Sequence, residues 1–439
     1  NQKLNEKPIK KLVWQYDFSL SPPKKTLCFF SIQRMISLRE NHRLEIPNQW
    51  DRSGLPAWSF FNSELLQEEK DLLFRRHWQL ICHQNDLPEV GDFVTWDLVG
   101  ERALVIRGRD GQLRAFHNLC RHRGSRVIAK NSGNCRSSII CPFHGWAYNI
   151  DGTLRGAAQP SSLPTLDPVK YGLKPLEMDL WNGFVFIRFQ SGPQPPVSQM
   201  LDGFTQEIKN YDLPNLRSTG RGFWTDEIAA NWKCVRDVDN EGYHVPMAHP
   251  GLQDLFGKNY HDEPLKNGTS RSLGQFREGA AQLWSVRNYT ALLKPKNSLT
   301  ATQKSSWLYI GIFPNLVIGL YPDSVNFYQE YPVDYNKTIQ RGSTYKFADE
   351  DRQMRLSRYL SMRIDRLTSQ EDEQLITWTW EAALSSAYDG VILSDLEYGV
   401  KAYHDALRQH FPVLDGPEPP FQLLKAQNNH LIASRLKPD

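Results

Sequence analysis

The 439-residue chain lacks a charge excess of either sign. Its 52 Lys and Arg residues nearly balance 49 Asp and Glu residues, giving a formal net charge of +3. The basic residues form no block, and they are not interleaved with aromatic residues. This pattern argues against a nucleic-acid partner.

Long apolar runs are also absent. The most apolar stretch, residues 307–321, is too short for a membrane-spanning helix and is interrupted by Pro314 and Asn315. Its β-branched and aromatic residues predict two buried strands joined at that Pro-Asn pair. The first thirty residues show no apolar core followed by a cleavage site, so no signal peptide is predicted. We therefore expect a protein with no membrane partner.

Cysteine is scarce, with six residues in the whole chain. Six cysteines do not make a disulfide framework in a chain of this length, and two of them stand at metal-ligand spacing. A reducing, cytoplasmic location is therefore the expectation.

Composition along the chain predicts three parts. Residues 1–50 form an N-terminal extension expected to be flexible. Its first methionine is Met35, so whether residues 1–34 belong to the native protein stays open. Residues 51–195 form the second part, which ends in the linker-like SGPQPP. Residues 196–439 form the third part.

The second part has the pattern of a helix followed by short strands. Ser63–Ile81 carries apolar residues at helical spacing, with Asn62 or Ser63 as the N-cap. FVTWDL, ALVIR and RAFH then read as strands separated by turns, and Asp151-Gly152 reads as a hairpin turn. In the third part, Ser394 to Glu397 is a capping box that begins a helix running to about His410.

Four residues in the second part stand at metal-ligand spacing. They are Cys120, His122, Cys141 and His144, arranged as Cys-x-His and Cys-x-x-His. Two thiolates and two imidazoles could hold a structural zinc ion. The mixed pairs suit an asymmetric diiron cluster better, with both cysteines on one iron and both histidines on the other.

A second constellation lies in NWKCVRDVDNEGYHVPMAH, residues 231–249. If this segment is helical up to His244, then Asp237, Glu241 and His244 share one face. Pro246 would end or bend that helix, and His249 could then share an iron with His244. Two histidines and a carboxylate form the facial triad of oxygen-activating iron enzymes. Alone, Glu-x-x-His is also a common surface pair.

CRHRG (120–124) and CPFHGW (141–146) resemble the Rieske fingerprint. NWK with the Tyr-His-x4-His block resembles the iron site of ring-hydroxylating oxygenase α subunits, including choline- and betaine-type monooxygenases. The resemblance implies an α+β fold: a small antiparallel β Rieske domain and a helix-grip catalytic domain, an antiparallel sheet with a long C-terminal helix. It also implies a Rieske 2Fe-2S cluster and a mononuclear Fe(II).

In that family the third iron ligand is an aspartate near the C-terminus, and Asp372 matches it here. Ser369-x-x-Asp372 also fits a capping box, so a purely structural role stays open. The resemblance further implies a head-to-tail homotrimer in which Glu241 links His144 of one subunit with His244 of the next. A flavin- or ferredoxin-type reductase would pass electrons from NAD(P)H.

Two departures affect the expected pocket. Asp237, a candidate catalytic residue together with Glu241, replaces the usual asparagine, and the Gln-x-Gly pattern is replaced around Trp380 and Ala382. We expect dioxygen and a small organic substrate, with hydroxylation or dealkylation by a monooxygenase favoured. An aromatic ring dioxygenase and an electron-transfer protein with an inactive second site are the alternatives. Aromatic residues could enclose a cationic substrate: Trp284, Tyr309, Tyr321, Tyr328 and Trp380.

Overall fold

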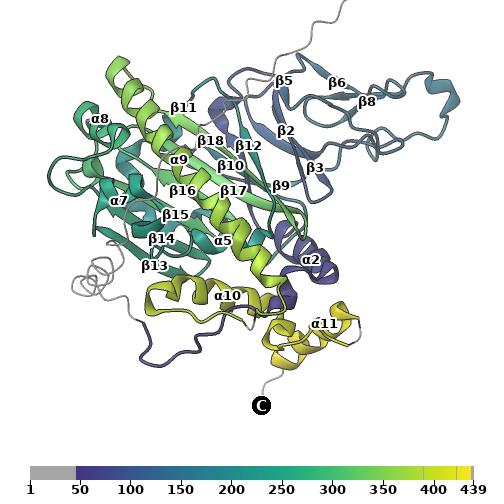
Figure 1. Cartoon of the computed structure of the whole chain (residues 1–439). Helices are drawn as coiled ribbons and strands as arrows, with labels where there is room; N and C mark the ends of the chain where they lie inside the picture. The colour runs from purple at the N-terminus through teal and green to yellow at the C-terminus, as the bar shows by residue number, and fades with distance from the viewer. Residues whose placement is uncertain (1–45, 389, 422, 437–439) are drawn as a thin grey trace, which may run out of the picture. The chain divides into compact units, whose positions relative to one another are not determined.

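Antiparallel sheets organise the part of the chain that the computed structural model describes, residues 46–388, 390–421 and 423–436 (Figure 1). Residues 44–439 form one compact unit. Most of the predicted N-terminal extension, residues 1–45, lies outside the described residues. None of the described helices is both long and apolar enough to cross a membrane.

The segment with the first Cys-His motifs folds into two small sheets, as its short apolar runs predicted. Their strand orders are β4-β3-β2-β5 and β6-β7-β8. Asp151 and Gly152 form the predicted hairpin turn between β7 and β8. The strands are β2 (Asp92–Leu98), β3 (Glu101–Arg107), β4 (Leu113–His117), β5 (Ser132–Asn134), β6 (Ser138–Ile140), β7 (Ala147–Asn149) and β8 (Leu154–Gly156).

A third sheet has the order β1-β10-β9, with β1 at Gln79–His83, β9 at Glu177–Trp181 and β10 at Phe184–Arg188. The predicted helix Ser63–Ile81 is wrong at its C-terminal end. Helix α2 (Ser63–Glu69) continues as a π-helical turn to Phe74, and its N-cap is Asn62, as predicted. Residues from Gln79 onward are buried and pair with β10 as a strand instead.

An eight-stranded antiparallel sheet dominates the C-terminal half. Its order is β11-β18-β17-β16-β15-β14-β13, and β12 also pairs with β18. The predicted pair of buried strands around Pro314 and Asn315 is confirmed as β15 and β16. The strands are β11 (Arg217–Ser218), β12 (Trp224–Ile228), β13 (Tyr260–Lys266), β14 (Thr269–Gln275), β15 (Ser306–Ile312), β16 (Leu316–Leu320), β17 (Val325–Asp334) and β18 (Lys337–Lys346).

Helix α9 (Arg352–Ala383) lies across this sheet (Figure 1). At 32 residues it is about 48 Å long. Its Leu360 and Ile364 pack in one buried cluster with Trp307 and Tyr321 of the sheet region. This long helix over an antiparallel sheet is the helix-grip arrangement that the family resemblance implied.

The other helices are shorter, and α5, α7 and α8 contact α9. The capping box at Ser394 is present and precedes α10, as predicted. The helices are α3 (Val197–Met200), α4 (Thr205–Ile208), α5 (Trp232–Val238), α6 (Val245–Ala248), α7 (Pro250–Phe256), α8 (Trp284–Leu292), α10 (Tyr398–His410) and α11 (Leu424–Arg435).

Candidate metal centres and the adjoining pocket

The two loops that carry the four Cys and His residues have the same backbone hydrogen-bond pattern. In each, a glycine four residues after the cysteine donates its backbone N–H to the carbonyl of that cysteine: Gly124 to Cys120 at 2.9 Å and Gly145 to Cys141 at 3.1 Å. Both glycines have positive φ, 74° and 68°, a conformation that a side chain disfavours. Each loop thereby folds back and presents its cysteine and histidine together.

The loops separate the two kinds of donor. Cys120 and Cys141 are buried, whereas His122 and His144 are exposed. The histidine rings lie 4.8 Å apart between centroids, and His122 stacks on Trp146. The Tyr148 hydroxyl lies 3.3 Å from the Cys120 sulfur. The donors fit a 2Fe-2S cluster, in which the buried cysteines would hold one iron and the exposed histidines the other.

Burial raises the pKa of the Cys120 thiol, although the Tyr148 hydroxyl partly offsets this. A buried thiol therefore needs a bound cation before it can remain a thiolate. Neither Cys120 nor Cys141 is in a disulfide. The two thiols thus fit metal ligation.

The second constellation is assembled from three elements. His244 is the N-cap of α6, His249 joins α6 to α7, and Asp372 lies within α9. The prediction of one helix up to His244 is wrong, because α5 ends at Val238. Pro246 falls in the first turn of α6, where its missing N–H costs no helical hydrogen bond. The capping alternative for Asp372 also fails, since Asp351 caps α9.

Three possible ligand atoms converge at this site. The Nε2 atoms of His244 and His249 are 3.0 Å apart. Asp372 Oδ1 lies 2.9 Å from His249 Nε2 and 3.7 Å from His244 Nε2. One ligand atom from each residue lies within 4.8 Å of the others, as a shared metal ion requires.

Each histidine uses its other ring nitrogen for a carboxylate. His244 Nδ1 lies 2.5 Å from Glu241 Oε1, and His249 Nδ1 lies 2.9 Å from Glu371 Oε2. A proton on each Nδ1 leaves both Nε2 lone pairs directed at one point. Asp372 Oδ1 is buried and receives no hydrogen bond from the described residues. These three acceptors require a cation between them, so they fit Fe(II).

Asp237 does not join this group. His404 of α10 lies 3.0 Å from its carboxylate and is 2% exposed. The residue therefore connects α5 to α10, because the helix ends before it could share a face with Glu241 and His244. Nothing in its placement supports the catalytic role expected from the sequence.

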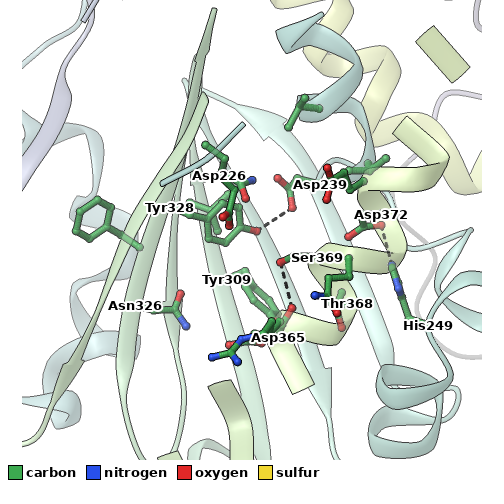
Figure 2. Close-up of a pocket in the computed structure, with 18 of the residues that line it drawn as sticks. Asp226, Asp239, His249, Tyr309, Asn326, Tyr328, Asp365, Thr368, Ser369 and Asp372 are labelled. Atoms are coloured by element: carbon green, nitrogen blue, oxygen red, sulfur yellow. Dashed lines mark hydrogen bonds and ion pairs between the residues drawn. The ribbon is translucent and has the colours of Figure 1, made fainter. Parts of the chain in front are cut away.

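A cavity of about 600 Å³ adjoins the three converging atoms (Figure 2). Tyr309, Tyr321 and Tyr328 of the predicted aromatic set line it. Trp284 is 58% exposed on α8, and Trp380 packs against the core; neither lines the cavity.

One wall of the cavity is a charged network. Arg236 of α5 lies 2.8 Å from Asp239 and 3.1 Å from Glu330. The Tyr328 hydroxyl donates to Asp239 at 2.8 Å (Figure 2). Burial raises the pKa of Glu330 to about 8 despite Arg236. Burial raises the pKa of Asp239 as well, and Arg236 opposes that shift, so one arginine serves both carboxylates.

Sequence reasoning missed Asp239, Glu371 and Asp365 as candidates. Glu371 is adjacent to Asp372 on α9, and the two carboxylates contact different nitrogens of His249. Asp365 precedes Asp372 by seven residues, and an i, i+7 spacing on α9 places both on one face. That periodicity could have identified Asp365, but only once α9 was known to extend this far.

Two family models match separate parts of the chain. The Rieske [2Fe-2S] domain matches residues 77–167. The ring hydroxylating alpha subunit (catalytic domain) matches residues 215–412. Each match contains one of the two constellations.

The chain is similar along most of its length to the carnitine monooxygenase oxygenase subunit of Escherichia coli K12. They are 27% identical over 369 residues, which cover 81% of this chain and 93% of that protein. The glycine betaine monooxygenase oxygenase subunit of Pseudomonas aeruginosa PAO1 is 33% identical over 45% of each chain. Chloroplastic choline monooxygenase of Beta vulgaris is 32% identical over 47% of this chain and 46% of its own.

Solved structures share the fold. A quaternary ammonium Rieske monooxygenase, described as showing inter-subunit electron transfer, superposes with a TM-score of 0.69 at 24% identity, covering 81% of this chain and 95% of its own. Naphthalene 1,2-dioxygenase with bound indole superposes with a TM-score of 0.65 at 20% identity, covering 88% and 97%.

Proposed function

The chain belongs to the Rieske non-haem iron oxygenases as a catalytic α subunit, and we propose that it hydroxylates a small substrate carrying a quaternary ammonium group. The observation that carries this proposal is the cavity, which combines tyrosine rings with carboxylates beside the three converging ligand atoms. Tyrosine faces and carboxylates both attract cations. Carnitine, glycine betaine and choline monooxygenases are among its relatives.

We assign the metal ligands from the geometry described above. Cys120, Cys141, His122 and His144 would hold the 2Fe-2S cluster, whereas His244, His249 and Asp372 would hold the mononuclear iron. When bound, the cluster supplies an electron and the mononuclear iron activates dioxygen. Glu241 and Glu371 hold the two histidine rings in position through Nδ1.

The cavity walls orient the substrate. The Arg236–Asp239 ion pair fixes one wall, and Tyr328 is held against it by its hydroxyl. Hydroxylation of a carbon attached to nitrogen consumes one dioxygen, two electrons and two protons and releases one water. The hydroxylated product then loses a proton and breaks its C–N bond, giving an amine and an aldehyde.

The electron supply and assembly complete the proposal. As an oxygenase subunit, the chain requires a reductase that draws electrons from NAD(P)H; we propose a flavin- or ferredoxin-type partner in the cytoplasm. We further propose a head-to-tail homotrimer. The exposed His144 and Phe143 on one side, and the exposed Tyr243 and Met247 beside Glu241 on the other, support such a contact. Glu241 would then link His144 to His244 of the neighbour.

The two rival functions are less well supported. A neutral arene would supply no positive charge to Asp365, a cavity carboxylate that forms no ion pair with the described residues. An electron carrier with an inactive second site would not need the complete set His244, His249 and Asp372.

Substrate-dependent oxygen uptake tests the proposal. The holoenzyme, a reductase and NADH would be incubated with carnitine, glycine betaine, choline or naphthalene. We expect uptake with at least one quaternary ammonium compound, and one ¹⁸O atom from ¹⁸O₂ in its primary product. Turnover of naphthalene to a doubly labelled diol, with none of the cations, would overturn the proposal.

A further inference from the structure

Six carboxylates besides Asp372 line the cavity, and two of them, Asp239 and Asp365, differ in their partners. Asp239 lies 2.8 Å from Arg236, so its carboxylate already has a cationic partner within the protein. Asp365, on α9, also lines the cavity (Figure 2). Its side chain accepts a hydrogen bond from the Tyr321 hydroxyl at 3.0 Å. Among the described residues, no Lys, Arg or His side chain forms an ion pair with Asp365.

Two tyrosines hold their positions beside Asp365. Tyr321 stacks on Trp307, with ring centroids 4.0 Å apart and planes 8° from parallel. Its hydroxyl lies 3.1 Å from that of Tyr309, and the two rings meet edge to face. Asp365 therefore faces the cavity from a site whose neighbouring rings are fixed by packing.

The spacing to the iron ligand suits a small head group. Asp365 and Asp372 are seven residues apart on α9, which is about 10 Å along the helix axis on one face. A cationic nitrogen held by Asp365 would therefore lie between the two carboxylates. Its attached carbon atoms would then be directed toward the side where His249 and Asp372 converge.

We propose that Asp365, together with the rings of Tyr309 and Tyr321, binds the positively charged nitrogen of the substrate and selects cations over neutral molecules. This inference rests on the proposed function and names the residue that recognises the head group. A half-buried carboxylate that forms no ion pair gains from a ligand that supplies the missing positive charge. Asp239 is a weaker candidate for binding the cation, because its carboxylate already forms an ion pair with Arg236.

Ligand binding to the iron-loaded holoprotein tests this inference. Calorimetry would measure dissociation constants for tetramethylammonium, choline and 3,3-dimethylbutan-1-ol, the neutral carbon isostere of choline. Asp365→Asn is expected to weaken binding of both cations about ten- to hundredfold, the loss for one charge-assisted contact. It should change binding of the neutral alcohol less than about twofold.

Matched variants separate recognition from charge and folding. Glu381→Gln removes one exposed carboxylate from the same helix and should leave all three constants unchanged. Asp365→Glu keeps the charge and should restore most of the cation affinity. If Asp365→Asn does not fold, Tyr321→Phe, which removes the hydroxyl donor but keeps the ring, should still shift cation affinity and not alcohol affinity.

The outcomes distinguish this inference from the proposed function. Equal binding of cations by the wild type and Asp365→Asn, equal weakening of cation and alcohol, or no cation binding by the wild type would each overturn the inference. If Asp365→Asn oxidises a quaternary ammonium substrate with an unchanged KM, the proposed function holds and the role of Asp365 is wrong. Asp365-dependent binding without any oxidation would overturn only the proposed function.

Discussion

Glu371 and His249 form a carboxylate–imidazole pair, with 2.9 Å between Glu371 Oε2 and His249 Nδ1. The other histidine of the site, His244, has an equivalent partner in Glu241. Each candidate iron-binding imidazole is therefore held at its far nitrogen by a glutamate. His249 is 1% exposed, so its ring orientation depends on this contact and on packing.

Glu371→Gln should lower the affinity of the mononuclear site for Fe(II) by about ten- to hundredfold, the usual effect of losing a carboxylate behind a metal-binding histidine. The amide keeps the size of the side chain but loses its negative charge. Metal titration of the iron-depleted protein measures the change without turnover. Glu381→Gln is the matched control, and equal affinities in both variants would contradict the positioning role.

The affinity for a cationic substrate should rise with pH near neutrality. Burial raises the pKa of Asp365 to about 7, the Tyr321 hydrogen bond opposes this, and Asp323 adds to it. Tyr309 and Tyr289 also face this region, but they remain neutral because burial raises the pKa of each well above 10. A cation binds the ionised carboxylate, so KM should fall as pH increases from 6 to 8.

Steady-state kinetics at several pH values measure this trend. The pH dependence of KM in the wild type should exceed that in Asp365→Asn, which cannot ionise at this position. Identical profiles for the two proteins would assign the titration to another group.

The Lys233–Glu69 ion pair should contribute strongly to folding. Its atoms lie 2.6 Å apart, both side chains are 1% exposed, and the Trp232 indole donates to the same carboxylate at 2.7 Å. Lys233→Met leaves a buried charge without its partner, so unfolding free energy should fall by about 3–5 kcal/mol. Denaturant titration measures this loss, and the double variant with Glu69→Leu should recover part of it. Additive losses would contradict direct pairing.

His83 should make the fold less stable in mild acid. Burial lowers the pKa of His83 to about 4, against an ordinary value of 6.5, although the carbonyl of Leu213 accepts a hydrogen bond from its ring. Between pH 6.5 and 4 the unfolded chain takes up a proton that the folded chain does not. Unfolding free energy should therefore decrease by up to about 1.4 kcal/mol per pH unit from this residue.

Comparison with His83→Gln isolates that contribution, because the amide cannot titrate. Denaturation midpoints at pH 7 and pH 5 should differ less in the variant than in the wild type. Equal differences would show that groups other than His83 govern the acid response.

The sequence predicted local elements best where the residues that form them are close together in the chain. The Cys-x-His and Cys-x-x-His loops, the strands around Pro314 and the capping box at Ser394 all followed from neighbouring residues. The end of α5 at Val238 did not, because a helix-compatible pattern continues past it. Asp237 was consequently assigned to the wrong face.

The pocket was harder to predict because tertiary packing decides it. Tyr309, Tyr321 and Tyr328 line the cavity, whereas Trp284 and Trp380 do not, although all five are equally plausible aromatic candidates in the sequence. The pairings of Arg236 with Glu330 and of Glu371 with His249 join segments about 90 or more residues apart. No periodicity connects such distant positions.

Iron and zinc analysis with an absorption spectrum of the anaerobically purified protein tests the two-centre account most directly. The wild type should contain about three irons per chain with Rieske absorption bands, and His249→Ala should lose about one iron and keep the bands. Cys141→Ser should lose the bands and about two irons. Zinc in a colourless wild-type protein, or loss of the Rieske bands in His249→Ala, would contradict two separate iron centres.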